Sequence, residues 1–472
     1  MLVAAFAARA DERPISLFLI GDSTCATKDL DKGNPERGWG QMLQPFFDSG
    51  VAVENHAVNG RSTKSFRAEG RWDEVLESLK SGDYVFIEFG HNDAKINDST
   101  RYSPPACYAE NLRAYVRETR SRGAVPVLLN SIVRRAWTNG CLTDTHGEYL
   151  VEARRVADEE RVIFFDMEAA TRSWVSSLGE EASRDYYMWV EPGVCPLHPD
   201  GRRDDTHLNV RGARVVAGMV ADRIAESIPQ LAVHLVRYDF VVAQDGSGDF
   251  FTVRELLDAL PDFARQEIRV LIRNGVYEEK IVVPTTKQHL RLIGESRDGV
   301  VLTWGDYASK RTVTGAEAGT SGSSSFYVCA PDFTAENLTF ENSAGRVGQA
   351  VAVQCIGDRC VFRNCRFLGN QDTLYLYGAG NRDGKEYIPN ARIYLCECYV
   401  EGTTDFVFGS ATALFERCRL HAKANSWVTA ASTCKGQPYG LVFRDCEFTA
   451  DEDVTKCYLG RPWRNYARTV LI

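Results

Sequence analysis

The stretch FRNCRF, residues 362–367, contains a phrase that returns three more times in the second half of the chain. The later copies are CECYV at 396–400, FERCRL at 415–420 and FRDCEF at 443–448. One position of the phrase is filled by Cys365, Cys398, Cys418 and Cys446, and Leu338 in AENLTF fits the same slot. The copies are about 20 to 33 residues apart, which is typical of a parallel β-helix whose coils differ in loop length. We therefore expect these side chains to form a buried, stacked ladder.

Residues 236–472 are thus predicted to form a right-handed parallel β-helix, with a β-sandwich as the alternative fold. One helical segment, TVRELLDALPDF at 252–263, comes before the coils. The chain stops on ARTVLI at 467–472, which is typical of an apolar strand. Because a bare strand edge leaves backbone groups unpaired, we expect a C-terminally truncated β-helix whose final coil lies beyond this chain.

Residues 12–232 follow a different pattern, in which short apolar runs alternate with helix-like segments. The apolar runs are ISLFLIGDS at 15–23, DYVFIEFG at 83–90, AVPVLLNS at 124–131 and RVIFFDM at 161–167. A helix-like segment such as CYAENLRAYVRETRSRG at 107–123 lies between them. Buried parallel strands joined by helices predict a doubly wound α/β domain.

The bulk composition fits two soluble domains in a chain of 472 residues, with 44% hydrophobic and 25% charged residues. A net charge of −9 argues against nucleic acid and anionic membranes as partners. No apolar run is long enough to span a bilayer. The first residues, MLVAAFAARADERP, resemble the last part of a secretory signal, so we expect a secreted or periplasmic bacterial protein with a clipped or incomplete export signal.

The first candidate site begins with Ser23 in FLIGDSTCA, directly after a predicted strand. A serine in this place is often only a helix N-cap, but three other blocks stand at strand ends or near the end of the domain: VNGRSTKSF, EFGHND and DDTHLNVRGA. An acyl-transfer serine needs a base, an acid that orients the base, and donors for the oxyanion. Asp204 and His207, three apart on one predicted loop, can supply the acid and the base, while Gly60 and Asn92 can each supply an N–H.

Residues 15–230 resemble the SGNH (GDSL-type) hydrolases, and within them the rhamnogalacturonan acetylesterases. GWGQML, HAVNGRSTKSFRAEGRW, GDYVFIEFGHND and GAVPVLLNSIVRR add to this likeness. The resemblance implies that Ser23 is the nucleophile, His207 the base and Asp204 its orienting acid. It also implies that Gly60 and Asn92 are oxyanion donors, and the family's D-x-x-H spacing selects Asp204 over its neighbour Asp205.

The second half offers no motif-like histidine but a set of polar residues within predicted strands: Gln349, Gln371, Asp372, Asp405, Arg461 and Trp463. Each one singly is most simply a surface or turn residue. Asp372 and Asp405 differ, because each stands just before an apolar or aromatic run in its own coil, and stacked coils lie about 5 Å apart. Two close carboxyls in an apolar groove do not ionise together, so one is expected to remain an anion paired with Arg461 while the other keeps its proton.

The segment from FVVAQDGSGDFFTV at 240–253 to the chain end resembles the pectin methylesterase family. The motifs GTSGSSSFYV, GQAVAV, NQDTLY, DFVFG and YLGRPW carry the likeness. It implies that Asp405 is the nucleophile, Asp372 the acid and base, and Gln349 and Gln371 the oxyanion donors. Arg461 would orient Asp405, and Tyr375, Phe408 and Trp463 would line a sugar-binding groove. A lengthened loop, GAGNRDGKEYIPN at 378–390, is expected near that groove.

Together these readings predict a bifunctional pectin-deesterifying enzyme that needs no cofactor and no metal. Its expected partners are methylated homogalacturonan and acetylated rhamnogalacturonan. Two alternatives use the same β-helix: a polysaccharide lyase, which would need a Ca²⁺-binding carboxylate cluster, and a non-catalytic pectin-binding module fused to the acetylesterase.

Overall fold

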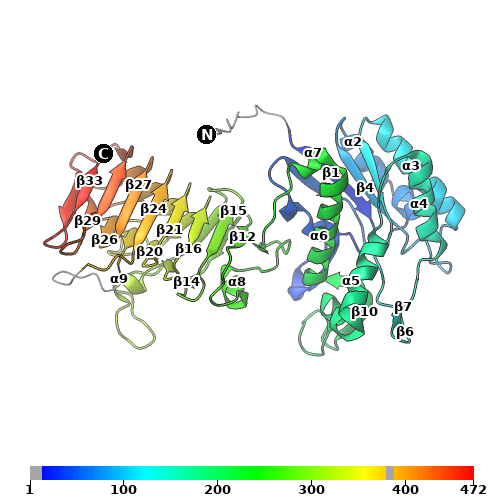
Figure 1. Cartoon of the computed structure of the whole chain (residues 1–472), viewed down its shortest axis with the longest axis horizontal. Helices are drawn as coiled ribbons and strands as arrows, with labels where there is room; N and C mark the ends of the chain where they lie inside the picture. Colours follow the sequence, from blue (N-terminus) through cyan, green and yellow to red (C-terminus); the bar gives the residue numbers. More distant parts are fainter. Residues whose placement is uncertain (1–12, 379–386) are drawn as a thin grey trace. The chain divides into compact units, whose positions relative to one another are not determined.

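The computed structural model describes residues 13–378 and 387–472 and divides the chain into two compact units, Met1–Arg237 and Tyr238–Ile472 (Figure 1). The expected export signal at residues 1–12 and the central part of the expected long loop, 379–386, lie outside the described residues. None of the described helices is long and apolar enough to cross a membrane.

The first unit is built on a five-stranded parallel sheet in the order β3-β1-β4-β5-β8. Its strands are β1 (Ile15–Gly21), β3 (Val51–Asn55), β4 (Tyr84–Glu88), β5 (Val125–Leu129) and β8 (Ile163–Phe165). The helices are α1 (Thr63–Ala68), α2 (Arg71–Ser78), α3 (Pro105–Ser121), α4 (Glu148–Glu160), α5 (Met167–Ala182), α6 (Val210–Ser227) and α7 (Pro229–Ala232). Short 3₁₀ turns span Asp31–Gly33, Trp39–Met42, Gln44–Phe46 and Ser183–Tyr186.

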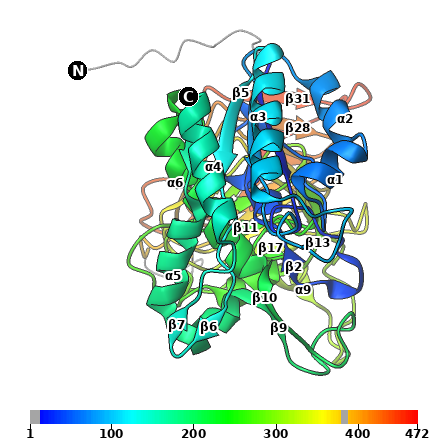
Figure 2. The ribbon, with the colours of Figure 1, turned by 90° about the vertical axis from the view of Figure 1, so that its right-hand side faces the viewer.

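Helices cover both faces of this sheet, because successive side chains of its strands point to opposite sides. Leu17 and Leu19 of β1 pack into the core that contains α6, whereas Phe18 and Ile20 pack into the core of α3 and α4. Figure 2 shows α3 and α4 side by side. The predicted doubly wound α/β fold is confirmed.

A small antiparallel sheet, in the order β2-β10-β9, adds to this unit. Its strands are β2 (Glu36–Arg37), β9 (Tyr187–Val190) and β10 (Arg202–Asn209), and a separate hairpin joins β6 (Trp137–Thr138) to β7 (Cys141–Leu142). The strand β10 carries two residues of the first candidate site, so this sheet decides how they face Ser23.

The described part of the second unit coils through three parallel sheets, and Figure 1 shows its strands stacked in sequence order. The first sheet contains β11 (Phe240–Val242), β12 (Ile268–Ile272), β15 (Leu290–Gly294), β18 (Thr334–Glu336), β21 (Cys360–Arg363), β24 (Arg392–Cys396), β27 (Thr412–Glu416), β30 (Leu441–Arg444) and β33 (Thr469–Leu471). The second contains β13 (Gly275–Glu278), β16 (Val300–Trp304), β19 (Thr339–Asn342), β22 (Arg366–Leu368), β25 (Tyr399–Gly402), β28 (Arg419–Ala422) and β31 (Glu447–Ala450).

The third sheet carries the second candidate site and contains β14 (Ile281–Val283), β17 (Phe326–Val328), β20 (Val353–Cys355), β23 (Leu374–Leu376), β26 (Val407–Gly409), β29 (Trp427–Ala431) and β32 (Tyr458–Pro462). Two helices accompany the coils, α8 (Val253–Ala259) and α9 (Gly319–Gly322). The predicted parallel β-helix is confirmed, and the helical segment expected at 252–263 is α8, where Thr252 and Glu255 form a capping box.

The repeated phrase marks the corner between the first and second sheets. Its cysteine follows a residue with positive φ, such as Asn364 before Cys365 or Glu397 before Cys398, and that backbone turn directs the thiol inward. The Sγ atoms of Cys365, Cys398, Cys418 and Cys446 each lie 3.4–3.5 Å from a carbonyl oxygen of the preceding coil. All fourteen cysteines are free thiols. The predicted ladder is confirmed, although Cys446 is only partly buried.

Candidate active sites

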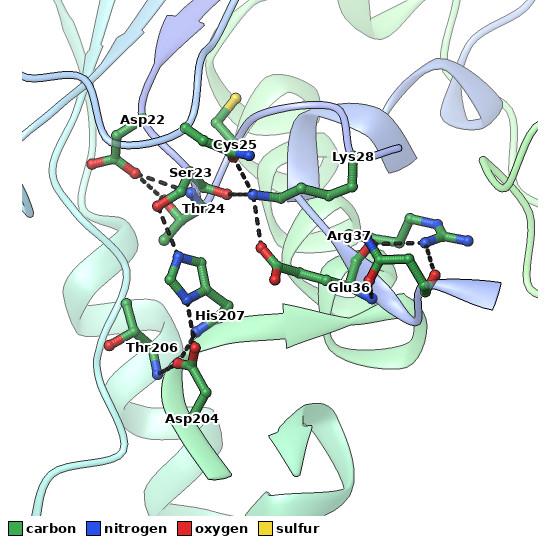
Figure 3. A network of polar contacts seen from close by, with 12 residues as sticks. Asp22, Ser23, Thr24, Cys25, Lys28, Glu36, Arg37, Asp204, Thr206 and His207 are labelled. Carbon is green, nitrogen blue, oxygen red and sulfur yellow. Dashed lines mark hydrogen bonds and ion pairs between the residues drawn. The ribbon is translucent and has the colours of Figure 1, made fainter. Parts of the chain in front are cut away.

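A serine, a histidine and an aspartate lie in hydrogen-bond contact at the carboxyl end of β1 (Figure 3). The Ser23 Oγ lies 2.9 Å from Nε2 of His207, and Nδ1 of His207 lies 2.8 Å from Oδ2 of Asp204. The Asp204 carboxylate accepts a hydrogen bond from Nδ1–H of His207. This contact favours the tautomer whose Nε2 carries no proton and can accept the serine proton. This triad of Ser23, His207 and Asp204 can activate a serine for attack on a carbonyl carbon.

The carboxylate of Asp204 is held by several donors. Its Oδ1 accepts the backbone N–H groups of Thr206 at 2.8 Å and His207 at 3.0 Å. Burial raises the pKa of Asp204, but the hydrogen bonds and charge of His207 outweigh burial and hold that pKa well below its usual value. Asp204 therefore stays an anion that orients the imidazole.

The prediction that Asp204 and His207 lie on a loop is wrong, because both belong to β10. In a regular strand, residues three apart point to opposite faces. The pairing of β10 with β9 is irregular between Asp204 and Leu208, and this bulge allows both side chains to meet. The neighbouring Asp205 is directed elsewhere: its Oδ1 accepts the indole N–H of Trp189 at 2.9 Å and pairs with Arg135.

The two expected oxyanion donors lie at the same edge of the sheet as Ser23. Gly60 follows β3 and Asn92 follows β4, and these strands flank β1 on either side. The segments that carry Gly60 and Asn92 contact each other, because Asn92 Nδ2 donates to the carbonyl of Arg61 at 3.0 Å. Gly60 has a φ of +75°, a conformation that a residue with a Cβ rarely adopts. Their role as donors stays a prediction.

Three charged residues around the triad were not anticipated from the sequence: Lys28, Glu36 and Arg202 (Figure 3 labels the first two). Arg202 Nη2 donates to Oδ2 of Asp204 at 2.6 Å, and its Nη1 donates to Glu36 Oε2 at 2.6 Å. Lys28 Nζ lies 2.9 Å from Glu36 Oε1 and donates to the carbonyl of Ser23 at 2.6 Å. No spacing rule joins positions 28, 36 and 202, so only the fold reveals this network.

Asp22, Glu88 and His91 form a buried group whose ligand-type atoms lie within 4.8 Å of one another. Burial raises the pKa values of Asp22 and Glu88 and lowers the pKa of His91. The hydroxyl of Thr24 contacts both carboxyl groups, and His91 Nδ1 lies 2.9 Å from His146 Nε2.

In the second unit, Asp372 and Asp405 occupy equivalent positions of consecutive coils. Leu374 of β23 pairs with Val407 of β26. Asp372 lies two residues before Leu374, and Asp405 lies two residues before Val407. The φ angles are +67° at Asp372 and +50° at Asp405, the left-handed region that aspartate tolerates better than most residues. The shared corner of the coil therefore places the two carboxyl groups one layer apart.

Arg461 binds Asp405 with both arms of its guanidinium group. Nε donates to Oδ1 at 2.9 Å, and Nη2 pairs with Oδ2. Arg461 stands two coils after Phe408, with Ala430 between them in the register. A small side chain at Ala430 leaves room for the arginine to cross back to Asp405, and this alanine was not anticipated from the sequence.

Asp372 differs from Asp405 in having no ionic partner of its own among the described residues. Burial, and then the negative charge of Asp405, raise the pKa of Asp372 to about 7, while Arg461 opposes them. Near neutral pH Asp372 can therefore hold a proton beside a carboxylate that is bound to arginine. The expected division between a proton donor and an anion is what this geometry favours.

A cavity of about 530 Å³ opens over the two aspartates. Tyr375 and Phe408 stack with ring centroids 4.2 Å apart, and Trp463 meets the Phe408 ring edge-on at 5.7 Å. Gln349 and Gln371 line the same cavity and pair as neighbours in register, and Thr320 and Ser321 close it from α9. The second site thus joins every residue expected there in one pocket, and it adds Thr320, Ser321 and Ala430.

Comparisons with known proteins divide the chain in the same way. The Pectinesterase family model matches residues 239–472, and the GDSL-like Lipase/Acylhydrolase family model matches residues 19–215. Pectinesterase 31 of Arabidopsis thaliana is 42% identical over 238 residues, 49% of this chain and 71% of that protein. Rhamnogalacturonan acetylesterase RhgT of Bacillus subtilis is 38% identical over 226 residues, 48% of this chain and 96% of that protein. The chain belongs to both families.

Membership makes this GDSL-like acylhydrolase and pectinesterase a carboxylic ester hydrolase in both halves, and it confirms the two predicted resemblances. Among solved structures, pectin methylesterase PemA from Erwinia chrysanthemi is 30% identical, with a TM-score of 0.45, over 50% of this chain and 78% of that chain. The pectinesterase half does not favour the lyase and binding-module alternatives, because neither is an ester hydrolase.

Proposed function

We propose that the chain removes two kinds of ester from pectin. The β-helix unit hydrolyses methyl esters of homogalacturonan to pectate and methanol, and the α/β unit removes O-acetyl groups from rhamnogalacturonan. One observation carries the proposal: two complete and chemically different ester-hydrolysing constellations, a Ser–His–Asp triad and a carboxyl pair beside an arginine, occur in one chain.

In the α/β unit, Ser23 Oγ attacks the acetyl carbonyl while His207 Nε2 takes its proton. Asp204 stabilises the imidazolium that forms. The N–H groups of Ser23, Gly60 and Asn92 would bind the oxyanion. His207 then returns the proton to the departing sugar hydroxyl, and water releases acetate from the acetyl-serine by the same steps in reverse order.

In the β-helix unit, Asp405 is the nucleophile and Arg461 orients its oxygens. Its attack on the methyl ester carbonyl forms an acyl anhydride, and Asp372 donates its proton to the departing methanol. Asp372, now an anion, takes a proton from water, and the resulting hydroxide cleaves the anhydride to return both carboxyl groups to their starting state. The amides of Gln349 and Gln371 would hold the oxyanion.

The walls of the second pocket suit a sugar chain. Tyr375, Phe408 and Trp463 present flat apolar faces against which pyranose rings can stack. Neither mechanism needs a cofactor or a metal, since water is the only co-substrate. An extracellular or periplasmic location fits a polymer that a cell cannot import whole, and the first residues of the chain support it by their likeness to an export signal.

The proposal is tested by measuring acetate and methanol together on native acetylated, methylated pectin. Ser23→Ala is expected to lower acetate release by at least about a thousandfold and to leave methanol release unchanged. Asp405→Asn is expected to do the reverse. If either substitution reduced both products alike, or if native protein released neither, the two-site assignment would be wrong.

A further inference from the structure

We propose that Glu36 is a positioning residue of the acetylesterase site, which neutralises the two cations that hold the Ser23–His207–Asp204 triad in place. This inference rests on the proposed esterase chemistry of that triad. Glu36 lies on β2 and does not touch Ser23 or His207, so it acts through Lys28 and Arg202.

The polar contacts around the triad close into a ring. Starting at the serine, Lys28 donates to its carbonyl and pairs with Glu36 Oε1 at 2.9 Å, and Glu36 Oε2 accepts from Arg202 at 2.6 Å. Arg202 also donates to Asp204, and the hydrogen bonds of the triad connect Asp204 through His207 to the Ser23 hydroxyl. Glu36 is the one member that binds both cations (Figure 3 shows its contact with Lys28).

Burial makes the charge of Glu36 consequential. The side chain of Lys28 is 3% exposed and that of Glu36 is 12% exposed, so solvent screens their interaction poorly. Arg202 donates to Asp204 Oδ2, the same oxygen that faces His207 Nδ1. An arginine on that oxygen competes with the imidazolium that must form during the reaction, and Glu36 offsets this effect by drawing the guanidinium charge to its own side.

Other charged or titratable groups also face this region, and all of them except Arg202 stay unchanged in the test. From β10 these are Asp204 and Arg202; from the end of β1, Asp22; from the loop that follows it, Lys28; from the β4 loop, His91; and from the turn before β10, His198, whose Nε2 lies 3.5 Å from Arg202 Nη1. Lys28, Arg202, Glu36 and Asp204 sum to zero charge, since two are cations and two are anions. Removing Glu36 leaves one excess positive charge beside His207.

The test measures kcat and KM against pH for hydrolysis of p-nitrophenyl acetate, with Ser23→Ala defining the background. For Glu36→Gln we expect kcat to fall about threefold with KM little changed, because an excess cation disfavours the imidazolium. The same cation is expected to move the acid limb of kcat/KM to lower pH by about half a unit. Arg202→Gln removes a cation instead and is expected to move that limb to higher pH.

The combined variant Glu36→Gln with Arg202→Gln restores the charge balance, so its acid limb should return toward the native position. Glu168→Gln is the matched control, because Glu168 is also a buried carboxylate paired with an arginine, Arg172, and has no contact with the ring. Urea unfolding of the same samples reports whether the α/β unit stays folded, because methanol release depends on the β-helix unit alone. Opposite shifts that cancel cannot arise from a loss of packing alone.

The inference is overturned if Glu36→Gln and Arg202→Gln lower the rate without moving the acid limb, or move it in the same direction. It is also overturned if p-nitrophenyl acetate hydrolysis does not depend on Ser23, and then the triad assignment fails with it. If the Ser23-dependent limb shifts as expected but pectin yields no acetate, the inference stands and the polysaccharide assignment is the part that fails.

Discussion

Replacing Asp372 by asparagine tests whether this carboxyl group is held protonated inside the folded β-helix. Its pKa is about 7 in the folded chain and 3.8 for an ordinary aspartate. Between these two values the unfolded chain releases the proton and the folded chain keeps it, so the free energy of unfolding falls as pH rises through this window and stays low above it. Each pH unit corresponds to about 1.4 kcal/mol, so the whole window represents on the order of 4 kcal/mol.

Asparagine keeps the size of the side chain and cannot ionise. Relative to native protein, Asp372→Asn is therefore expected to gain stability from pH 5 to pH 8 by on the order of 3 kcal/mol, because about two pH units of the window lie in that interval. The same variant should release no methanol. Stability and activity would thus change in opposite directions at one residue.

Urea unfolding at pH 5 and pH 8 provides the measurement. Native and variant chains share the α/β unit, so a difference between their transitions reports the β-helix unit. With a slope of roughly 3 kcal/mol per molar urea, the midpoint of the variant should gain about 1 M relative to native between the two pH values. Asp453→Asn, at an exposed aspartate of the same unit, is the control. An equal difference between Asp372→Asn and native protein at both pH values would refute the reasoning.

Three further predictions concern the β-helix unit. Methanol release, followed as kcat/KM, should decline as pH rises above about 7, because Asp372 must carry a proton to protonate the leaving alcohol; a flat alkaline profile would contradict this. Arg461→Lys replaces a two-armed contact with a single charge, so methanol release should fall roughly 10- to 100-fold while acetate release is unchanged. Cys398→Ala removes a fully buried ladder residue and should lower unfolding free energy by about 1–2 kcal/mol, whereas a reducing agent should not alter the native transition.

The coils could be predicted from the sequence because the same corner between two strands recurs from coil to coil and requires the same residue types. The corner before Cys365 or Cys398 requires a residue that tolerates positive φ, followed by a small buried residue. This requirement produces the repeated sequence motif. The α/β unit was equally predictable from the sequence, because strands that are buried on both faces, such as residues 15–21, are continuous apolar runs. Each of these signals is local, which is why spacing and composition suffice.

The features that sequence reasoning missed depend on residues that only the fold brings together. The bulge of β10 is a property of its pairing with β9, so Asp204 and His207 were placed on a loop. The contacts of Glu36 with Lys28 and Arg202 join three separate elements. Neither a bulge nor a buried ion network produces a periodic pattern in the sequence, because each is fixed by tertiary contacts.

The second site, in contrast, lies at the corner between the second and third sheets in two consecutive coils. Asp372 and Asp405 both take a positive φ at this corner, whereas the positive φ of Asn364 and Arg417 belongs to the corner between the first and second sheets. The register between β23 and β26 then fixes their separation at one layer. Chemistry at this site therefore depends on which side chains stand at the same corner of two consecutive coils, and on a neighbour in the stack, Ala430, that is small enough to let Arg461 reach Asp405.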